Sequence, residues 1–440
     1  MPLIEAALEP ARKQFKPSEL KLLSKALADA YLLANNTPNI IYELILGGIL
    51  TATLVPLFTD DLENGDGSST SAVVSFVIVV LVGLAALTAL LSPGLMWLYA
   101  RGSPADSRAD FLGIGVRFAV LFAPQVFFYG LMALWSAVLN ARHRFFAAAW
   151  APVLNNLVVI GVLVATWRAV DGKPTIADLE HRSALLILLG LGTTAGIAAM
   201  TLSLWPALRR AGVDLRFRFE PRHPAVRRAA RLSSWTLGYV IANQVAVQVV
   251  SILAKPGTGG VQNYQTAFQF FQLPHGLLAV SIMVTFEPML GRAHARRDDA
   301  EYDRQLLLGF RLIGLLVVPA AAAYLALPGG LSHRTFTAHG GVAHALELVP
   351  IVAAFAIGLP GFSSYLYALR GFYALKDTRV PFYVNLFENG VNIVVAIAFV
   401  RWWGVVGLAL AYSVAYTVAA VAAVALLARR RPGFDWRSLA

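Results

Sequence analysis

The chain has 440 residues, of which 58% are hydrophobic and 14% are charged, and its formal net charge is +11. A soluble domain averages about 45–50% apolar and about 25% charged residues, so much of the apolar surface of this chain has to face lipid. The sequence contains no cysteine, which excludes disulfides, thiolate catalysis and cysteine-ligated metals.

Apolar runs of roughly 20 residues recur along the chain, and a run of that length crosses the hydrocarbon of a bilayer as a helix. The N-terminal region holds several lysines and lacks the apolar core of a cleavable signal peptide. The sequence therefore indicates an all-α polytopic membrane protein. We predict eleven spans, at residues 38–58, 72–99, 112–139, 147–168, 183–206, 232–254, 263–289, 305–327, 346–369, 380–400 and 403–428.

The basic residues are distributed unevenly among the loops, and an excess of Lys and Arg marks the cytoplasmic side. With the C-terminus taken as cytoplasmic, the inside loops carry 21 of these residues and the outside loops carry 7. We expect an N-terminal lobe at 1–206, a basic cytoplasmic linker at 207–231, a C-terminal lobe at 232–428 and a basic cytoplasmic tail at 429–440. Since the positive charge is of the kind that sets topology, we expect no nucleic-acid partner.

The two lobes carry an internal repeat. A shift of 236 residues places Pro124 on Pro360 and Asn156 on Asn392. Six spans separate the matching positions, so both halves run through the membrane in the same direction, as parallel repeats in transporters do. We therefore expect two pseudo-repeated six-helix bundles.

The repeat also predicts that the first helix is incomplete. A shift of 232 residues aligns Thr53–Pro56 with Thr285–Pro288. The same shift moves the span 232–254 onto residues 1–22, which are too polar to cross a membrane. We expect Ala26–Ala34 to be the remaining end of this helix, the rest being encoded upstream or lost in a specialised copy.

Polar side chains inside spans are costly unless they line a hydrated cavity or hydrogen-bond to neighbouring helices. On the spans 232–254 and 263–289, amide side chains recur three and four residues apart, which places them on one helical face. We predict that they line a cavity, with interhelical hydrogen bonding as the alternative. The candidate cavity residues are Asp29, Asn39, Glu43, Asn156, Gln244, Gln248, Gln265, Gln269 and Glu388.

No pattern of catalytic or metal-binding residues emerges. The histidines are scattered without metal-ligand spacing, and no glycine-rich phosphate loop follows a strand. We expect no catalytic residue, no metal site and no cofactor, hence a transporter rather than an enzyme. Transport would draw on an ion gradient, the membrane potential or the substrate gradient, and Asp29, Glu43 and Glu388 would suit a coupling proton or Na⁺.

Three segments resemble a known family. They are Ala28–Phe58 (ADAYLLANNTPNIIYELILGGILTATLVPLF), Pro124–Ile160 (PQVFFYGLMALWSAVLNARHRFFAAAWAPVLNNLVVI) and Phe271–Leu290 (FQLPHGLLAVSIMVTFEPML). They resemble the MurJ/MviN family of lipid II flippases, within the multidrug/oligosaccharidyl-lipid/polysaccharide (MOP) superfamily that includes the MATE transporters. The resemblance extends over most of the chain.

The resemblance implies two six-helix lobes around a central cavity that opens alternately to the two sides of a bacterial plasma membrane. The headgroup of lipid II would enter the cavity while its polyprenyl tail stays in lipid, and cell-wall synthesis proteins would be possible partners. Where many members of the family carry arginines, this chain has Glu43 after its Pro-Asn motif and Gln269 before Pro274. The expected cavity is therefore rich in amides rather than cationic.

Other functions fit the same pattern. One alternative is a flippase for another polyprenyl-linked glycan or an ion-coupled exporter of small molecules. Replacing Asp29, Glu43 and Glu388 would test the exporter, because pH- or Na⁺-dependent transport should then be lost. Another is a truncated paralogue that acts as a membrane scaffold without transporting, which the incomplete first helix favours.

Overall fold

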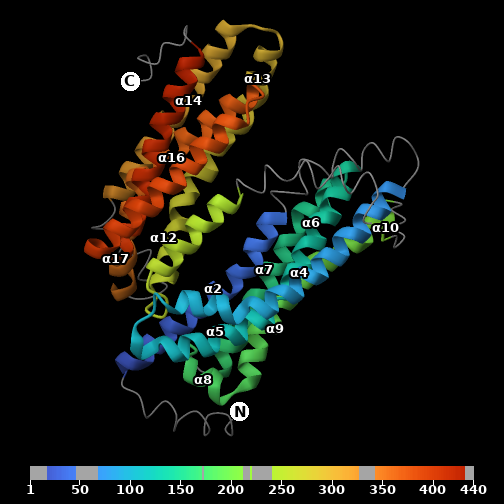
Figure 1. The fold of residues 1–440 in the computed structure, drawn as a ribbon, viewed down its shortest axis with the longest axis vertical. Coiled ribbons are helices and arrows are strands. Elements are labelled where there is room, and N and C mark those ends of the chain that lie inside the picture. The colour runs from blue at the N-terminus through green and yellow to red at the C-terminus, as the bar shows by residue number, and fades with distance from the viewer. Residues whose placement is uncertain are drawn as a thin grey trace. The chain divides into compact units, whose positions relative to one another are not determined.

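The computed structural model is helical throughout its described part, apart from turns and short connections (Figure 1). It describes residues 17–45, 68–170, 173–211, 219–220, 240–326 and 342–431. Within these residues, eight helices are long and apolar enough to cross a membrane, which confirms the predicted all-α membrane fold.

The chain divides into two compact units. Unit 1 comprises Met1–Gln244 and Lys255–Gly259, and unit 2 comprises Val245–Ala254 and Gly260–Ala440. The predicted linker lies largely outside the described residues, so the predicted domain boundaries stay a prediction.

Unit 1 is a bundle around α5 and α6. Its elements are α2 (Pro17–Ile45), α4 (Ser68–Ala100), η2 (Ala105–Ser107), α5 (Arg108–Phe122), α6 (Gln125–Ala141), α7 (Phe145–Ala169), α8 (Ile176–His181), α9 (Ser183–Leu202) and α10 (Trp205–Arg210). Helices α5 and α6 meet at Pro124, whose missing N–H interrupts the helical hydrogen bonding, and together they form one span. Helices α2, α4 and α9 pack against them, and α7 packs chiefly on α9.

The first described helix differs from the sequence prediction. The expected remnant at Ala26–Ala34 and the start of the span predicted at 38–58 belong to one helix, α2, in which Pro38 is internal. The prediction of a separate helix that begins near residue 38 is therefore wrong. Ala30 and Leu33 are fully buried in unit 1, where α2 packs on α5 and α6, and this packing stabilises the helix on both sides of the proline.

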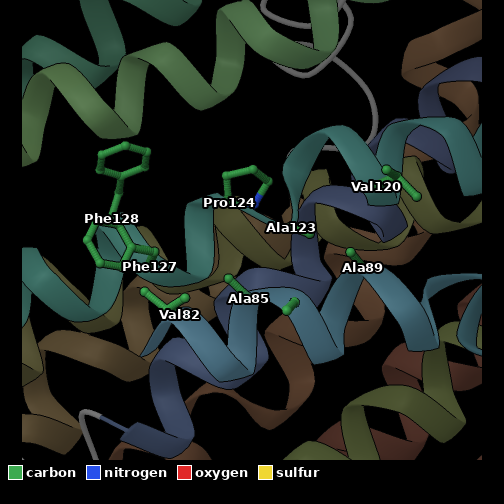
Figure 2. A pocket seen from close by; sticks show the side chains of 9 residues that line it. Val82, Ala85, Ala89, Val120, Ala123, Pro124, Phe127 and Phe128 are labelled. Atoms are coloured by element: carbon green, nitrogen blue, oxygen red, sulfur yellow. The ribbon is translucent and has the colours of Figure 1, made fainter. Parts of the chain in front are cut away.

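Unit 1 also contains an apolar hollow where α4 passes the break between α5 and α6 (Figure 2). Its volume is about 460 Å³. The alanines of α4 leave this space because their side chains do not reach across to the proline break. The hollow is lined by Val82, Ala85, Ala86, Ala89, Val120, Ala123, Pro124, Phe127 and Phe128.

Unit 2 begins within the helix Val240–Leu253, whose residues from Val245 on belong to it. Its further elements are α12 (Gly260–Pro274), the π-helical turn η3 (His275–Ala279), α13 (Val280–Ala295), α14 (Asp299–Ala326), α16 (Val342–Ala374) and α17 (Arg379–Arg430). Helix α16 packs against α12, α13, α14 and α17, so it forms the centre of this unit.

Helix α17 is an antiparallel hairpin. At about 1.5 Å per residue, its 52 residues would far exceed a hydrocarbon thickness of about 30 Å. Gly404 interrupts the helix with φ 54° and ψ −132°, a conformation open chiefly to glycine. If Gly407 had a Cβ atom, that atom would lie 2.4 Å from the carbonyl oxygen of Phe399, eight residues earlier. Residues this far apart do not meet within one straight helix, so the chain has turned back on itself. The predicted spans 380–400 and 403–428 are the two arms.

The two ends of the hairpin meet at one end of unit 2. Arg430, in the last turn of α17, forms an ion pair with Asp377, which precedes the first turn. Asp377 also accepts hydrogen bonds from the backbone N–H groups of Arg379 and Val380, at 2.9 and 3.2 Å. One carboxylate therefore caps the first arm and holds the end of the second.

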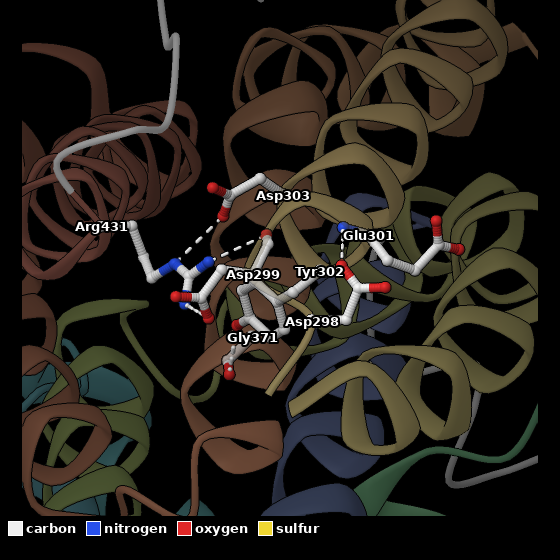
Figure 3. A network of polar contacts seen from close by, with 7 residues as sticks. All are labelled: Asp298, Asp299, Glu301, Tyr302, Asp303, Gly371 and Arg431. Atoms are coloured by element: carbon white, nitrogen blue, oxygen red, sulfur yellow. Dashed lines mark hydrogen bonds and ion pairs between the residues drawn. The ribbon is translucent and has the colours of Figure 1, made fainter. Parts of the chain in front are cut away.

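Arg431 ties the same end of α17 to the start of α14 (Figure 3). Its guanidinium contacts the carboxylates of Asp299 and Asp303, at 2.5 and 3.1 Å, and lies over the ring of Tyr302. The Tyr302 hydroxyl donates to the carbonyl oxygen of Gly371 on α16, at 2.8 Å. We call these five residues the Arg431 clasp, because they connect α14, α16 and α17.

The two units repeat one order of long helices. In unit 1, α4 is followed by the α5–α6 span and then by α7 and α9. In unit 2, α14 is followed by α16 and then by the two arms of α17. Each series packs on a central span, α5–α6 or α16, as the internal sequence repeat predicts.

Candidate functional site

Asp29 lies on α2 and is completely buried, with 0% of its surface exposed. One carboxylate oxygen accepts hydrogen bonds from the backbone N–H groups of Gly257 and Gly259, at 3.0 and 2.8 Å. Both donors belong to the loop Lys255–Gly259, which is part of unit 1 and leads directly into α12. Asp29 is therefore an anchor for this loop, a role that its position in the sequence alone does not indicate.

The loop can present both N–H groups to one oxygen because of its glycines. Gly257 and Gly259 have φ values of 88° and 85°, where a side chain would be strained. The Thr258 hydroxyl between them donates to the carbonyl oxygen of Lys255 at 2.7 Å and closes the turn. The signal in the sequence is the glycine-rich run from Lys255 to Gly260, which separates two apolar helices.

Glu43 and Gln244 are brought together although 201 positions separate them in the sequence. The side-chain amide of Gln244 donates a hydrogen bond to the carboxylate of Glu43. Glu43 is exposed and Gln244 is half-buried, so the pair lies at a surface of unit 1 rather than in its core. Asn39, one turn before Glu43, donates to the backbone carbonyl of Asn35 at 3.4 Å.

Asn156 lies on a different side of unit 1. It is exposed on α7, where Leu157 and Ile160 on the same helix are also strongly exposed. Its neighbour Asn155 instead faces α9, where its side-chain oxygen would lie 2.7 Å from a Cβ on Gly196. The described contacts do not bring Asn156 to the other predicted residues of unit 1.

The glutamines of α12 follow one open face of that helix. Gln265 is half-buried, whereas Gln269 and Gln272 are exposed. The opposite face carries Ala267 and Phe271, both buried in the core of unit 2. Gln248, on the helix Val240–Leu253, is half-buried. The amides of α12 are thus presented to the surroundings of unit 2, as a cavity-lining role requires.

Glu388 is the most isolated acidic group of the described residues. It lies on the first arm of α17 with 1% of its surface exposed, and neither carboxylate oxygen has a hydrogen-bond partner among the described residues. Asn385, Asn389 and Asn392 lie on the same face of the helix and are buried beside it. A buried carboxylate without a partner is costly, so this site favours binding a proton or a cation.

Aromatic side chains surround this site. The carboxylate of Glu388 lies within electrostatic range of Tyr264, Tyr412 and Tyr416. Tyr412 and Tyr416 face each other with ring centroids 4.4 Å apart, and Tyr264 packs on Phe355 at 5.1 Å. The aromatic part of the core of unit 2 therefore lies near Glu388. The sequence prediction named Glu388 and missed the tyrosines, which are spaced like ordinary core residues.

The titratable groups of the described part do not form a metal centre. Within those residues, no group of three or more His, Asp or Glu side chains is close enough to hold a metal ion. The polar groups described above are amides, single carboxylates and hydroxyls, which can bind sugars, phosphates or monovalent ions through hydrogen bonds and oxygen ligands.

Sequence comparisons match almost the whole chain to one family. A family model described as "Lipid II flippase MurJ" matches residues 22–440. A curated relative from Rhizobium tropici, named probable lipid II flippase MurJ, is 28% identical over 411 residues, which are 92% of this chain and 75% of the relative. The lipid II flippase MurJ of Burkholderia cenocepacia is 27% identical over 361 residues, 80% of this chain and 68% of that protein.

Solved structures share the fold. A lipid II flippase MurJ in an inward closed conformation matches with a TM-score of 0.72 and 20% identity, covering 100% of this chain and 89% of the other. An inward-facing multidrug resistance MATE family transporter of the MOP superfamily matches with a TM-score of 0.75 and 13% identity, covering 94% of both chains. The two-bundle architecture is therefore that of these membrane transporters.

Proposed function

The chain belongs to the lipid II flippase MurJ family, and on that premise we propose that it moves lipid-linked peptidoglycan precursor, lipid II, across the plasma membrane by alternating access. The observation that carries the proposal is the family match over residues 22–440, together with the two repeated bundles. A transporter of this kind needs no catalytic residue, because no covalent bond changes during translocation.

The proposed substrate site uses side-chain amides. Gln265 and Gln269 offer N–H donors and carbonyl acceptors on the open face of α12, and such groups hydrogen-bond sugars and phosphate oxygens. Glu43 accepts a hydrogen bond from Gln244 and stands where the resemblance to the family leads us to expect an arginine. We infer that this chain recognises the headgroup more through hydrogen bonds and less through charge than its relatives do.

The proposed orientation has a cytoplasmic C-terminus in a bacterial plasma membrane. The charge rule assigns three segments of unit 2 to the inside: 290–304, 370–379 and the segment from 429. The Arg431 clasp and the Arg430–Asp377 pair join these segments at one end of unit 2. In unit 1, Arg142 of one predicted inside loop donates to the carbonyl oxygen of Ala211 in another. These contacts support the alternation of the loops, since loops of one membrane side have to lie together, and the excess of Lys and Arg in these loops favours the cytoplasmic side.

The buried Glu388 supports coupling to a proton or Na⁺. Its carboxylate is isolated from solvent and from hydrogen-bond donors within the described residues, yet buried asparagines lie on the same face. Binding and release of a cation there would change the charge of the first arm of α17 and so bias a conformational equilibrium. The same site suits an ion-coupled exporter of small molecules, which is the second candidate function. Cell-wall synthesis proteins remain proposed partners.

The experiment is depletion of the protein in a host without a second flippase, with lipid II measured in each leaflet. We expect lipid II to accumulate in the inner leaflet, and expression of the chain to restore its export. An unchanged distribution would contradict the flippase proposal. Proteoliposomes containing the chain distinguish the exporter, because a flippase moves a lipid-linked headgroup whereas an exporter moves a water-soluble solute.

A further inference from the structure

Arg117 has no role in the site described above. It lies on α5, in the span Ala105–Ala141, and its side chain is exposed. Among the described residues, no hydrogen bond or ion pair involves its guanidinium. An arginine within a span is costly unless it reaches the interface or meets an anion, and the phosphate of a lipid at the interface satisfies both conditions.

The apolar hollow of unit 1 lies directly beside Arg117 along the same helix. Arg117, Val120 and Pro124 are spaced three and four residues apart, so they share one side of the span. Val120 and Pro124 line the hollow, and both are exposed to the surroundings of unit 1 (Figure 2). Helical side chains lean toward the helix N-terminus, so we expect the side chain of Arg117 to extend toward Arg108, just beyond the end of the hollow.

The hollow suits a flexible hydrocarbon chain. Its volume of about 460 Å³ is within the range of roughly 300–1,000 Å³ typical of ligand sites. Alanines of α4 form its floor, and no side chain that lines it carries a polar group. Val82 and Val120, which line it from two different spans, are 55% and 45% exposed, and exposed apolar side chains within a span are typical of a surface that faces lipid. A cation at one end of an apolar hollow matches a lipid, which has an anionic phosphate joined to hydrocarbon.

We propose that unit 1 binds one anionic phospholipid here, with its phosphate at Arg117 and an acyl chain in the hollow. A guanidinium forms a bidentate pair with one phosphate, which fits the single charge of a phosphodiester. A polyprenyl diphosphate would bring more charge than this one cation balances. The occupant is therefore a phospholipid of the membrane rather than the transported substrate, and the site is independent of the proposed function.

The test measures lipid binding to the purified full chain by native mass spectrometry. We expect phosphatidylglycerol to bind about fivefold more tightly than phosphatidylcholine, the factor expected for one basic residue near an anionic lipid. Arg117→Gln should remove this preference. Ala85→Phe, which fills the hollow, should weaken both lipids. Arg168→Gln, at an exposed arginine of α7 in the same unit, is the matched control and should change neither.

Each other outcome contradicts the proposal. It fails if Arg117→Gln keeps the preference, if Ala85→Phe binds as the parent does, or if a polyprenyl diphosphate displaces phosphatidylglycerol from the site. Thermal unfolding without added lipid checks folding. If Arg117→Gln alone is unstable, Arg117→Lys decides: it keeps the charge without the bidentate geometry, so the preference should weaken but persist. An unchanged or absent preference in that folded variant would count against a guanidinium–phosphate contact.

Discussion

A carboxylate oxygen of Asp29 accepts a hydrogen bond from the backbone N–H of Gly259 at 2.8 Å, across 230 positions of sequence. The same oxygen accepts the N–H of Gly257. Since each hydrogen bond to a charged group contributes about 1.5–3 kcal/mol, we predict that Asp29→Ala, which removes two of them, destabilises unit 1 by about 3–6 kcal/mol. Thermal unfolding of the detergent-solubilised protein measures this.

Asp29→Asn keeps one acceptor oxygen and should cost less than the alanine variant. Asp110→Asn, at an exposed aspartate of α5, is the control and should stay within about 0.5 kcal/mol of the parent. Equal stabilities for the Asp29 and Asp110 variants would contradict the anchoring role.

Glu388→Gln tests the proposed ion coupling. Glutamine keeps the shape of the side chain and is uncharged, so we expect the protein to fold as before. We expect transport in proteoliposomes to lose its response to an imposed proton or Na⁺ gradient, with the two gradients applied separately. Glu180→Gln, at an exposed site on α8, should keep the response. A full response in Glu388→Gln would exclude this residue as the coupling site.

Gly404→Ala should destabilise the α17 hairpin by about 1–3 kcal/mol, the cost of a residue in a sparsely populated backbone region. The space around this glycine is open, so the cost is conformational rather than steric. Gly390→Ala is a matched control in the first arm of the same helix, where space is also open and the backbone is helical. It should be neutral or stabilising by about 0.5–1 kcal/mol. Thermal unfolding of both variants in the same detergent measures these two costs, and equal stabilities would contradict the special role of Gly404.

Arg431→Gln should destabilise unit 2 by about 1–3 kcal/mol, because the side chain is only 12% exposed and its loss leaves Asp303 without its cation. Burial lowers the pKa of Arg431, but the hydrogen bonds with Asp299 and Asp303 raise it by more. The net shift of the pKa is therefore upward. The guanidinium therefore stays charged as the pH rises through the alkaline range, and its contribution should not decline there.

Arg304→Gln supplies the comparison for the clasp. Arg304 pairs with Glu301 one turn away, but its side chain is 72% exposed, and such pairs contribute roughly 0–1 kcal/mol. Stabilities that fall equally in the Arg431 and Arg304 variants would show that the clasp contributes no more than a solvated surface pair.

The sequence alone predicts those helices that are defined by the length of an apolar run. Runs of roughly 20 apolar residues located the spans, and the short polar interruption at Arg401 separated the two arms of α17. It was misleading at Pro38, because a proline predicts a helix end locally while the packing of Ala30 and Leu33 on α5 and α6 decides the outcome.

The site was predicted in part for a related reason. Glu43 and Gln244 were both named as polar residues in apolar surroundings, and they form a hydrogen bond. The partners of Asp29 are backbone N–H groups, which every residue except proline carries, so no side-chain pattern marks them. Arg431 was assigned to a topogenic tail, since charge counting does not reveal that its guanidinium contacts Asp299 and Asp303.

The turn at Gly404 also bears on how the protein is made. A turn this short leaves no loop that could be exported by itself, so insertion of the second arm of α17 is tied to insertion of the first. In the proposed orientation, Arg401 is the charged side chain that crosses the membrane with the turn. The exposed Trp402 and Trp403 follow it, and tryptophan prefers the membrane interface. Lengthening this turn would convert one insertion event into two and make the final topology depend on the translocation machinery.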